Sequence, residues 1–95
     1  MVDVDYLPQN YDLFQNYPNP FNPVTTISYQ IPENNHVTLK VFDMIGNEVE
    51  TLINEEKPAG YHTITFDAEN ISTGVYFYQL KVGDFVSTKK LILMK

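Results

Sequence analysis

Apolar and polar side chains alternate along most of the chain, in short runs separated by turn-forming residues. Residues 24–31 place Ile27, Tyr29 and Ile31 on one side, and Pro32 ends this run. Alternation with a period of two predicts a strand that buries one face. The same pattern predicts further strands over residues 36–43, 48–53, 61–66, 75–82 and 85–94.

Turn signals lie between the predicted strands. Gly46 suits a tight turn after Asp43, Pro58 and Gly60 end the strand before them, and Gly83-Asp84 is typical of a two-residue hairpin loop. The run 75–82 is apolar on both sides, which predicts a central strand with both faces covered. Six or seven short strands joined by such turns predict an all-β fold, an antiparallel β-sandwich of about seven strands of the immunoglobulin or fibronectin III kind.

Composition narrows the functional classes. The 95 residues suffice for one domain, and with no cysteine there is no disulfide or thiolate metal site. Twelve acidic residues against six lysines and no arginine speak against binding to nucleic acid. No apolar run approaches the roughly 18 residues that cross a bilayer, and the acidic start has no signal-peptide core. We therefore expect either a cytoplasmic protein or a piece of a longer chain.

Catalytic and metal-binding patterns are weak. His36 and His62 fall on different predicted strands without the spacing of a zinc site. The serines have no nucleophile-elbow context, and Glu55-Glu56 fits a solvated turn. The serines in question are Ser28, Ser72 and Ser87. We therefore expect no enzyme activity and no cofactor.

Two binding alternatives stay open. Carboxylate and amide oxygens in loops are ligands that calcium accepts, although no calcium-loop motif is present; the residues concerned are Asn16, Asn19, Asn22, Asp43 and Asp67. Strand tyrosines can form a platform for sugars, or they can simply pack across strands; the candidates are Tyr61, Tyr76 and Tyr78. The Asn70-Ile71-Ser72 sequon carries little weight by itself.

Residues 15–23, Gln-Asn-Tyr-Pro-Asn-Pro-Phe-Asn-Pro, are the most distinctive segment of the chain. Each proline fixes its own φ and keeps the residue before it out of the helical region, so the segment is extended or turning. Its three asparagines suit local Asx-turns. We predict a stiff entry loop before the first long strand.

Several motifs follow this segment in order. They are Asn16-Tyr17-Pro18-Asn19-Pro20-Phe21-Asn22-Pro23, then Thr26-Ile27, Val41-Phe42-Asp43 with Gly46, Ala59-Gly60-Tyr61-His62, Thr73-Gly74-Val75-Tyr76, and Lys89-Lys90-Leu91-Ile92-Leu93. Together they resemble the C-terminal sorting domain (type A) of the type IX secretion system, with a more distant similarity to the immunoglobulin-like domain of flagellar hook-capping proteins. Phe66 stands where the family often has tryptophan, Ala68 where it often has glycine, and lysines replace common arginines.

This resemblance implies a non-catalytic signal that directs an attached cargo across the outer membrane of a Gram-negative bacterium, to the cell surface or the medium. The implied partners are the outer-membrane translocon, a sortase, and a cargo domain upstream in the same chain. Residues 1–12 would then be the linker to the cargo and residues 13–95 the sorting domain. The resemblance assigns a structural role to Asn16, Pro18, Asn19, Pro20, Phe21, Asn22, Pro23, Gly46, Gly60, Asp67, Gly74 and Tyr76.

The translocon would read the last strand, by strand addition or by docking in a groove. The residues predicted for this recognition are Lys89, Lys90, Leu91, Ile92, Leu93, Met94 and Lys95. We further expect that deleting residues 91–95 traps the cargo in the periplasm while the rest of the domain remains largely folded. The alternative is an immunoglobulin-like adhesive, spacer or carbohydrate-binding module of a secreted protein. Lysines on a terminal strand also serve simply to discourage edge-to-edge pairing.

Overall fold

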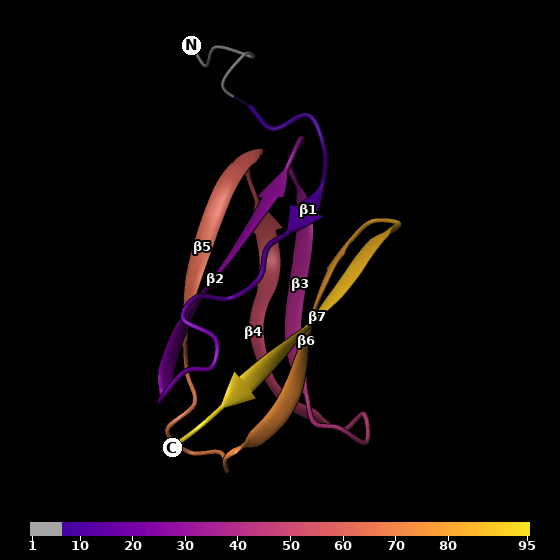
Figure 1. The fold of residues 1–95 in the computed structure, drawn as a ribbon. Helices are drawn as coiled ribbons and strands as arrows, with labels where there is room; N and C mark the ends of the chain where they lie inside the picture. Colours follow the sequence, from indigo (N-terminus) through magenta and orange to yellow (C-terminus); the bar gives the residue numbers. More distant parts are fainter. Residues whose placement is uncertain (1–6) are drawn as a thin grey trace.

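Two antiparallel sheets make up the computed structural model, which describes residues 7–95 (Figure 1). One sheet has the strand order β1-β2-β5, and the other has the order β4-β3-β6-β7. This confirms the all-β sandwich of about seven strands. The strands are β1 (Asp12–Leu13), β2 (Val24–Ile31), β3 (Asn35–Phe42), β4 (Glu48–Lys57), β5 (Gly60–Asp67), β6 (Gly74–Val82) and β7 (Phe85–Leu93).

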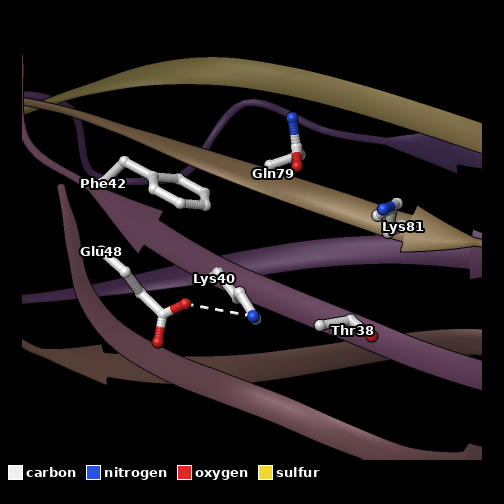
Figure 2. Close-up of a pocket in the computed structure, with 6 residues that line it drawn as sticks. All are labelled: Thr38, Lys40, Phe42, Glu48, Gln79 and Lys81. Atoms are coloured by element: carbon white, nitrogen blue, oxygen red, sulfur yellow. Dashed lines mark ion pairs between the residues drawn. The ribbon is translucent and has the colours of Figure 1, made fainter. Parts of the chain in front are cut away.

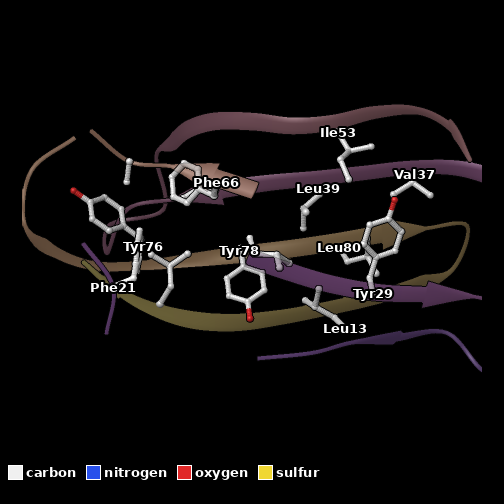
Figure 3. Packing of buried hydrophobic residues seen from close by; sticks show 14 of the residues in the cluster. Leu13, Phe21, Tyr29, Val37, Leu39, Ile53, Phe66, Tyr76, Tyr78 and Leu80 are labelled. Atoms are coloured by element: carbon white, nitrogen blue, oxygen red, sulfur yellow. The ribbon is translucent and has the colours of Figure 1, made fainter. Parts of the chain in front are cut away.

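The inward faces of both sheets form one core (Figure 3). In β2, Ile27, Tyr29 and Ile31 are almost completely buried, while the residues between them are exposed or half-buried, as the alternation predicted. Burying a side chain of this size stabilises the fold by roughly 1.5–3 kcal/mol relative to exposure. The other core residues are Leu13, Phe21, Val37, Leu39, Val41, Ile53, Phe66, Ala68, Tyr76, Tyr78, Leu80, Val82, Leu91 and Leu93.

Strand β6 lies between β3 and β7, which confirms its predicted central position. Its inward side chains, among them Tyr78 and Leu80, are fully buried. Its outward side chains are not covered: Phe77 and Gln79 are half-buried and Lys81 is exposed. The prediction that both faces are covered is therefore wrong for the outer face, because no further layer of the chain packs on it among residues 7–95.

Two of the predicted turns are built around a glycine with positive φ. In the β3–β4 turn, Asp43 accepts hydrogen bonds from the backbone N–H groups of Ile45 and Asn47 (3.0 and 2.9 Å), and Gly46 has φ +91°. In the β6–β7 hairpin, Gly83 has φ +59° in a two-residue loop. A β-carbon at either position would strain the backbone, which explains why glycine is used there.

The N-terminal part of the described chain contacts the sandwich before β1 begins. Pro8 is buried, and the ring of Tyr11 stacks on Phe85 with centroids 5.5 Å apart. The Tyr11 hydroxyl donates to Glu33 (2.8 Å), and this bond to a carboxylate raises the Tyr11 pKa. Of the predicted linker, residues 1–6 lie outside the described residues, and residues 7–12 contact the domain.

Two of the three departures from the motif pattern, Phe66 and Ala68, lie in the core. Phe66 is buried and packs against Phe21 with ring centroids 6.1 Å apart. Ala68 is buried, and its N–H donates to the Pro23 carbonyl (2.8 Å). Ala68 does not have a positive φ, so the turn at this point does not require glycine.

Candidate functional site

The last strand alternates between the core and the surface. Leu91 and Leu93 are fully buried, whereas Lys90 is exposed and Ile92 is half-exposed. Deleting residues 91–95 would therefore remove two core side chains, at about 2–5 kcal/mol each for comparable truncations. The burial of Leu91 and Leu93 therefore argues against the expectation that the rest of the domain stays largely folded after this deletion.

The predicted recognition residues thus divide by position. The side chains of Lys89 and Ile92 are half-exposed, and those of Lys90, Met94 and Lys95 are exposed. The backbone N–H of Lys95 donates to the Thr73 hydroxyl (3.1 Å), and its ammonium group donates to the carbonyl of Glu69. These five residues can meet a partner, while Leu91 and Leu93 hold the strand in place.

The free edge of β7 is covered near the C-terminus by residues 15–21, which we call the clasp segment. Two of its side-chain amides take positions that a neighbouring strand would occupy. The Gln15 amide donates to the carbonyl of Lys90 (2.8 Å), and the Asn19 amide oxygen accepts from the N–H of Ile92 (2.9 Å). One amide thus acts as a donor and the other as an acceptor to the edge of β7.

Phe21 completes the cover with its backbone. Its N–H donates to the Ile92 carbonyl and its carbonyl accepts from the Met94 N–H, both at 3.0 Å, in a parallel bridge to Leu93. Its side chain is buried. Together with the two amides, these bonds satisfy the outward backbone groups at Ile92 and part of those at Lys90 and Met94, so a partner strand cannot add there while the clasp segment is in place.

Two buried hydroxyl groups hold the clasp segment against the core. The Tyr78 hydroxyl donates to the Phe14 carbonyl (2.7 Å) and accepts from the Asn16 N–H (2.8 Å). The Thr25 hydroxyl donates to the Pro18 carbonyl (2.8 Å) and accepts from the Asn16 side chain (3.0 Å). Burial raises the Tyr78 pKa to about 12, so this hydroxyl keeps its proton well above neutral pH.

The asparagines of the clasp segment only partly follow the predicted local turns. Asn16 is buried and does bond nearby, to the Pro18 carbonyl (3.2 Å), as well as to Thr25. Asn19 instead bonds to Ile92, 73 residues away, so the local Asx-turn predicted for it is wrong. No signal in the sequence marks this contact, because nothing in the chain pattern pairs the first loop with the last strand.

Other motif residues lie in turns and at strand starts. Asp67 accepts from the N–H of Glu69 (3.0 Å), and the Tyr76 hydroxyl donates to the carbonyl of Ser72 (2.6 Å). Gly60 begins β5 and Gly74 begins β6. These contacts agree with a structural use of the motif positions.

The residues considered for metals lie apart from one another. His36 bonds to the Asn54 side chain (2.6 Å), and His62 bonds to the Pro58 carbonyl (2.8 Å) and stacks on Tyr29. Within residues 7–95 no three potential metal ligands among histidine and the acidic residues form a group. Of the calcium candidates, Asp43 and Asp67 each cap their own turn, and Asn16 is engaged in the clasp segment.

The remaining chemical candidates are also separated. Ser28 lies in β2, Ser87 in β7, and Ser72 in the loop before β6. Glu55 pairs with Lys57 at 3.2 Å on an exposed strand. Of the three tyrosines proposed as a sugar platform, Tyr61 is exposed, but Tyr76 and Tyr78 are buried, so that platform is wrong.

A groove crosses the outer face of the four-stranded sheet (Figure 2). It encloses about 240 Å³ and is lined by Thr38, Lys40, Phe42, Glu48, Gln79 and Lys81. Lys40 pairs with Glu48 at 3.0 Å, and this bond, with a second from Thr51, lowers the pKa of the Glu48 carboxyl. Lys81 makes no ion pair within the described chain, so it carries the unbalanced charge of the groove.

The strand register shows which side chains of β6 and β7 share the outer face. Across the β6–β7 pairing, Phe77 faces Lys90, and Lys81 faces Val86. Opposed residues of neighbouring strands project on the same side of a sheet. Lys81 and Lys90 therefore share one surface with the half-buried Phe77, and this surface adjoins the predicted recognition residues.

No helix among the described residues has the length and apolar character to cross a membrane. Comparison with known families gives one match: a family model described as the secretion system C-terminal sorting domain covers residues 15–94. No curated protein and no solved structure matches the chain. The matched region begins at the first residue of the clasp segment and ends at Met94, one residue after β7. This match confirms the resemblance that the motifs indicated. The chain belongs to the family of type IX secretion C-terminal sorting domains.

Proposed function

We propose that this domain is a folded address that directs an attached cargo through the outer membrane by the type IX system, acting by binding and not by catalysis. The observation that carries the proposal is the family match over residues 15–94. Its partners would be the outer-membrane translocon and a sortase, with the cargo joined through residues 1–12. The cargo would reach the cell surface or the medium.

The recognised surface in this proposal is the outer face of the four-stranded sheet near β7. Lys81 and Lys90 are both exposed on this face; Lys90 lies opposite Phe77, and Lys81 lies four residues further along β6. The edge of β7 is a poorer candidate, because its last hydrogen-bonding positions are occupied by the clasp segment. Docking on the face, rather than strand addition at this edge, is the mode that the contacts support.

Lysines on this face suit a partner with acidic groups. The chain carries a formal charge of −6, so its lysines are the minority charge, and two of them project from the same face here. Interfaces pair opposite potentials, which speeds encounter and sets the orientation of the complex. The half-buried aromatic ring of Phe77 supplies apolar contact beside the charges.

A reporter fusion tests the proposal. Residues 1–95 are fused to the C-terminus of a reporter that carries its own signal peptide, in a bacterium with a functional type IX system and in a strain lacking the translocon. We expect reporter on the surface or in the medium only in the competent strain. A reporter that stays in the periplasm of both strains, or leaves both, would contradict the proposal. The first result is what a spacer module would give.

A further inference from the structure

The outer face of the three-stranded sheet differs in chemistry from the outer face of the four-stranded sheet, which carries Lys40, Glu48 and Lys81. Between Thr26 and Gln30 the outward side chains of β2 and β5 are hydroxyls, one amide and one phenol, paired across the two strands; the next outward pair is Val24 with Asp67. We call this surface the hydroxyl face. Its members are Thr26, Ser28, Gln30, Tyr61, Thr63 and Thr65.

Exposed aromatic rings border the hydroxyl face. Tyr61 is 65% exposed at one end of β5, and Tyr17 is 81% exposed beside Thr26. Phe14 is 39% exposed next to Ser28, to whose carbonyl its N–H donates (3.0 Å). These are the three aromatic residues among the large exposed hydrophobic side chains of residues 7–95, and all three lie on one face.

The backbone holds these rings in fixed places. Tyr17 exchanges two backbone hydrogen bonds with Thr26, both at 3.0 Å, so its side chain projects on the same side as that of Thr26. Tyr61 pairs with Gln30 in the β2–β5 ladder. A ring presented by a hydrogen-bonded backbone loses little conformational freedom when a ligand covers it.

The hydroxyl face carries almost no charge. On β1, β2 and β5 the charged side chains that project outward are Asp12 and Asp67, which lie at opposite ends. The rest of the face is neutral, in a chain with twelve acidic residues and six lysines. A neutral face offers nothing to a charged partner, but its hydroxyl and amide groups can both donate and accept hydrogen bonds.

The dimensions fit an extended ligand. Successive outward rows on a strand are about 7 Å apart, and neighbouring strands are about 4.8 Å apart. Tyr17 and Tyr61 are two rows and two strands apart, so they are separated by roughly 17 Å on the diagonal. The aromatic rings thus mark the two ends of a path too long for a single small sugar.

We propose that the hydroxyl face binds a neutral polysaccharide chain, which stacks on Tyr17 and Tyr61 and hydrogen-bonds to the threonines between them. Aromatic rings supply apolar contact with one polar end, and hydroxyl rows match the donors and acceptors of an uncharged sugar. The proposal concerns a surface on the opposite sheet from Lys81 and Lys90, so it stands or falls independently of the sorting function.

Affinity electrophoresis of the full 95-residue chain tests the proposal. The gels contain hydroxyethyl cellulose, galactomannan or soluble xylan as neutral polymers, with alginate as the anionic comparison. We expect at least one neutral polymer to retard the protein, and alginate not to do so. Amide NMR shifts on adding the retarding polymer should map to Thr26, Ser28, Thr63 and Thr65.

Matched variants decide which residues are responsible. Tyr61→Ala and Tyr17→Ala should each weaken the apparent affinity by roughly fivefold to tenfold, the worth of one aromatic contact. Tyr61→Phe should keep most of it. Ile45→Ala removes an equally exposed apolar side chain, 83% exposed on the β3–β4 turn, and should change nothing.

Several results would overturn the proposal. They are retardation by none of the neutral polymers, equal retardation by alginate, shifts confined to the four-stranded sheet, or unchanged binding in the double variant Tyr17→Ala/Tyr61→Ala. Concentration-dependent sedimentation without sugar, lost on Tyr61→Ala, would make a second copy of the chain the occupant. Thermal unfolding of each variant shows that a loss of binding is not a loss of the fold.

Discussion

The two edges of the four-stranded sheet are protected in different ways. The β7 edge is covered near its end by the clasp segment, through the side chains of Gln15 and Asn19 and the backbone of Phe21. The β4 edge has no such cover within residues 7–95 and relies on exposed carboxylates and on two irregularities in its pairing with β3. The carboxylates are those of Glu48, Glu50, Glu55 and Glu56.

The β4 edge is only protected from pairing with other chains, whereas the β7 edge is also hydrogen-bonded to one particular segment of its own chain. Charges and bulges keep an edge from pairing with other chains, and they need no partner within the fold. The clasp segment does more, because it fixes the last strand to a segment more than 70 residues earlier. Strand β7, which carries part of the face that we propose to be recognised, is thus held in place by the clasp segment.

Two buried tyrosines of the core also differ in whether they hydrogen-bond to another segment. Tyr78 lies under the clasp segment and uses its hydroxyl in two hydrogen bonds. Tyr29 is equally buried, but its hydroxyl has no partner among the described residues. The first hydroxyl connects elements, whereas the second only fills space.

Among the variants proposed as tests, Phe21→Ala should destabilise the fold most and should expose the edge of β7. The variant removes a buried ring that packs against Phe66, and we expect a loss of about 3–5 kcal/mol in the free energy of unfolding. Urea unfolding measures the loss. Native-state hydrogen exchange should accelerate at the amides of Ile92 and Met94 beyond the global change. Ile53→Ala in β4, the matched core truncation, should lack that local excess.

Alkaline pH should lower the stability of the fold, because two buried tyrosines must ionise. Burial raises the pKa of Tyr29 and of Tyr78 to about 12, with Glu55 adding to the effect at Tyr29, from an unfolded value of 10.0. Because the folded pKa is the higher one, the stabilisation is complete below pH 10 and is lost as pH rises toward 12, by roughly 2 kcal/mol per tyrosine. Urea unfolding between pH 8 and 12 measures it.

The double variant Tyr29→Phe/Tyr78→Phe is the control for this prediction. It keeps every lysine, so any remaining slope between pH 10 and 12 comes from other groups. A slope equal to that of the parent chain would show that the two tyrosines are not the cause.

Single tyrosine variants sharpen the comparison at neutral pH. Tyr78→Phe leaves the Phe14 carbonyl and the Asn16 N–H without their buried partner, so we expect a loss of about 1–3 kcal/mol. Tyr29→Phe removes a hydroxyl that has no described partner and should change stability by less than about 0.5 kcal/mol. Thermal and urea unfolding test the pair. If the two variants lost the same free energy of unfolding, the hydrogen bonds of the Tyr78 hydroxyl would contribute little to stability.

Asn19→Ala should have the smallest effect on stability. It removes one exposed hydrogen bond to the Ile92 N–H, for an expected loss of about 0.5–1.5 kcal/mol. Hydrogen exchange should quicken at Ile92 while Leu91, which bonds within the sheet, stays protected. Exchange at Ile92 that does not change would show that the side chain is not its partner in solution. Asn22→Ala, at an exposed asparagine directly after the clasp segment, is the matched control.

Local patterns predicted the strands well and the long-range contacts poorly. Alternation located β2 and β3, and glycine placed the turns after Asp43 and Val82, because these signals act over a few residues. In β6 both sides are aromatic or apolar, so the pattern did not show that Tyr76 and Tyr78 face inward. The bond from Asn19 to Ile92 depends on how the sheets stack, which no local rule encodes.

The most direct test compares, in the reporter fusion, variants at the β7 edge with variants on the outer face of the four-stranded sheet. One variant opens the edge, Gln15→Ala/Asn19→Ala; the other alters the face, Lys81→Glu/Lys90→Glu; and Lys57→Glu is the charge control away from this face. With all three folded, the account predicts that export is lost only in the face variant. Export that survives the face variant but fails when the edge is opened would contradict it.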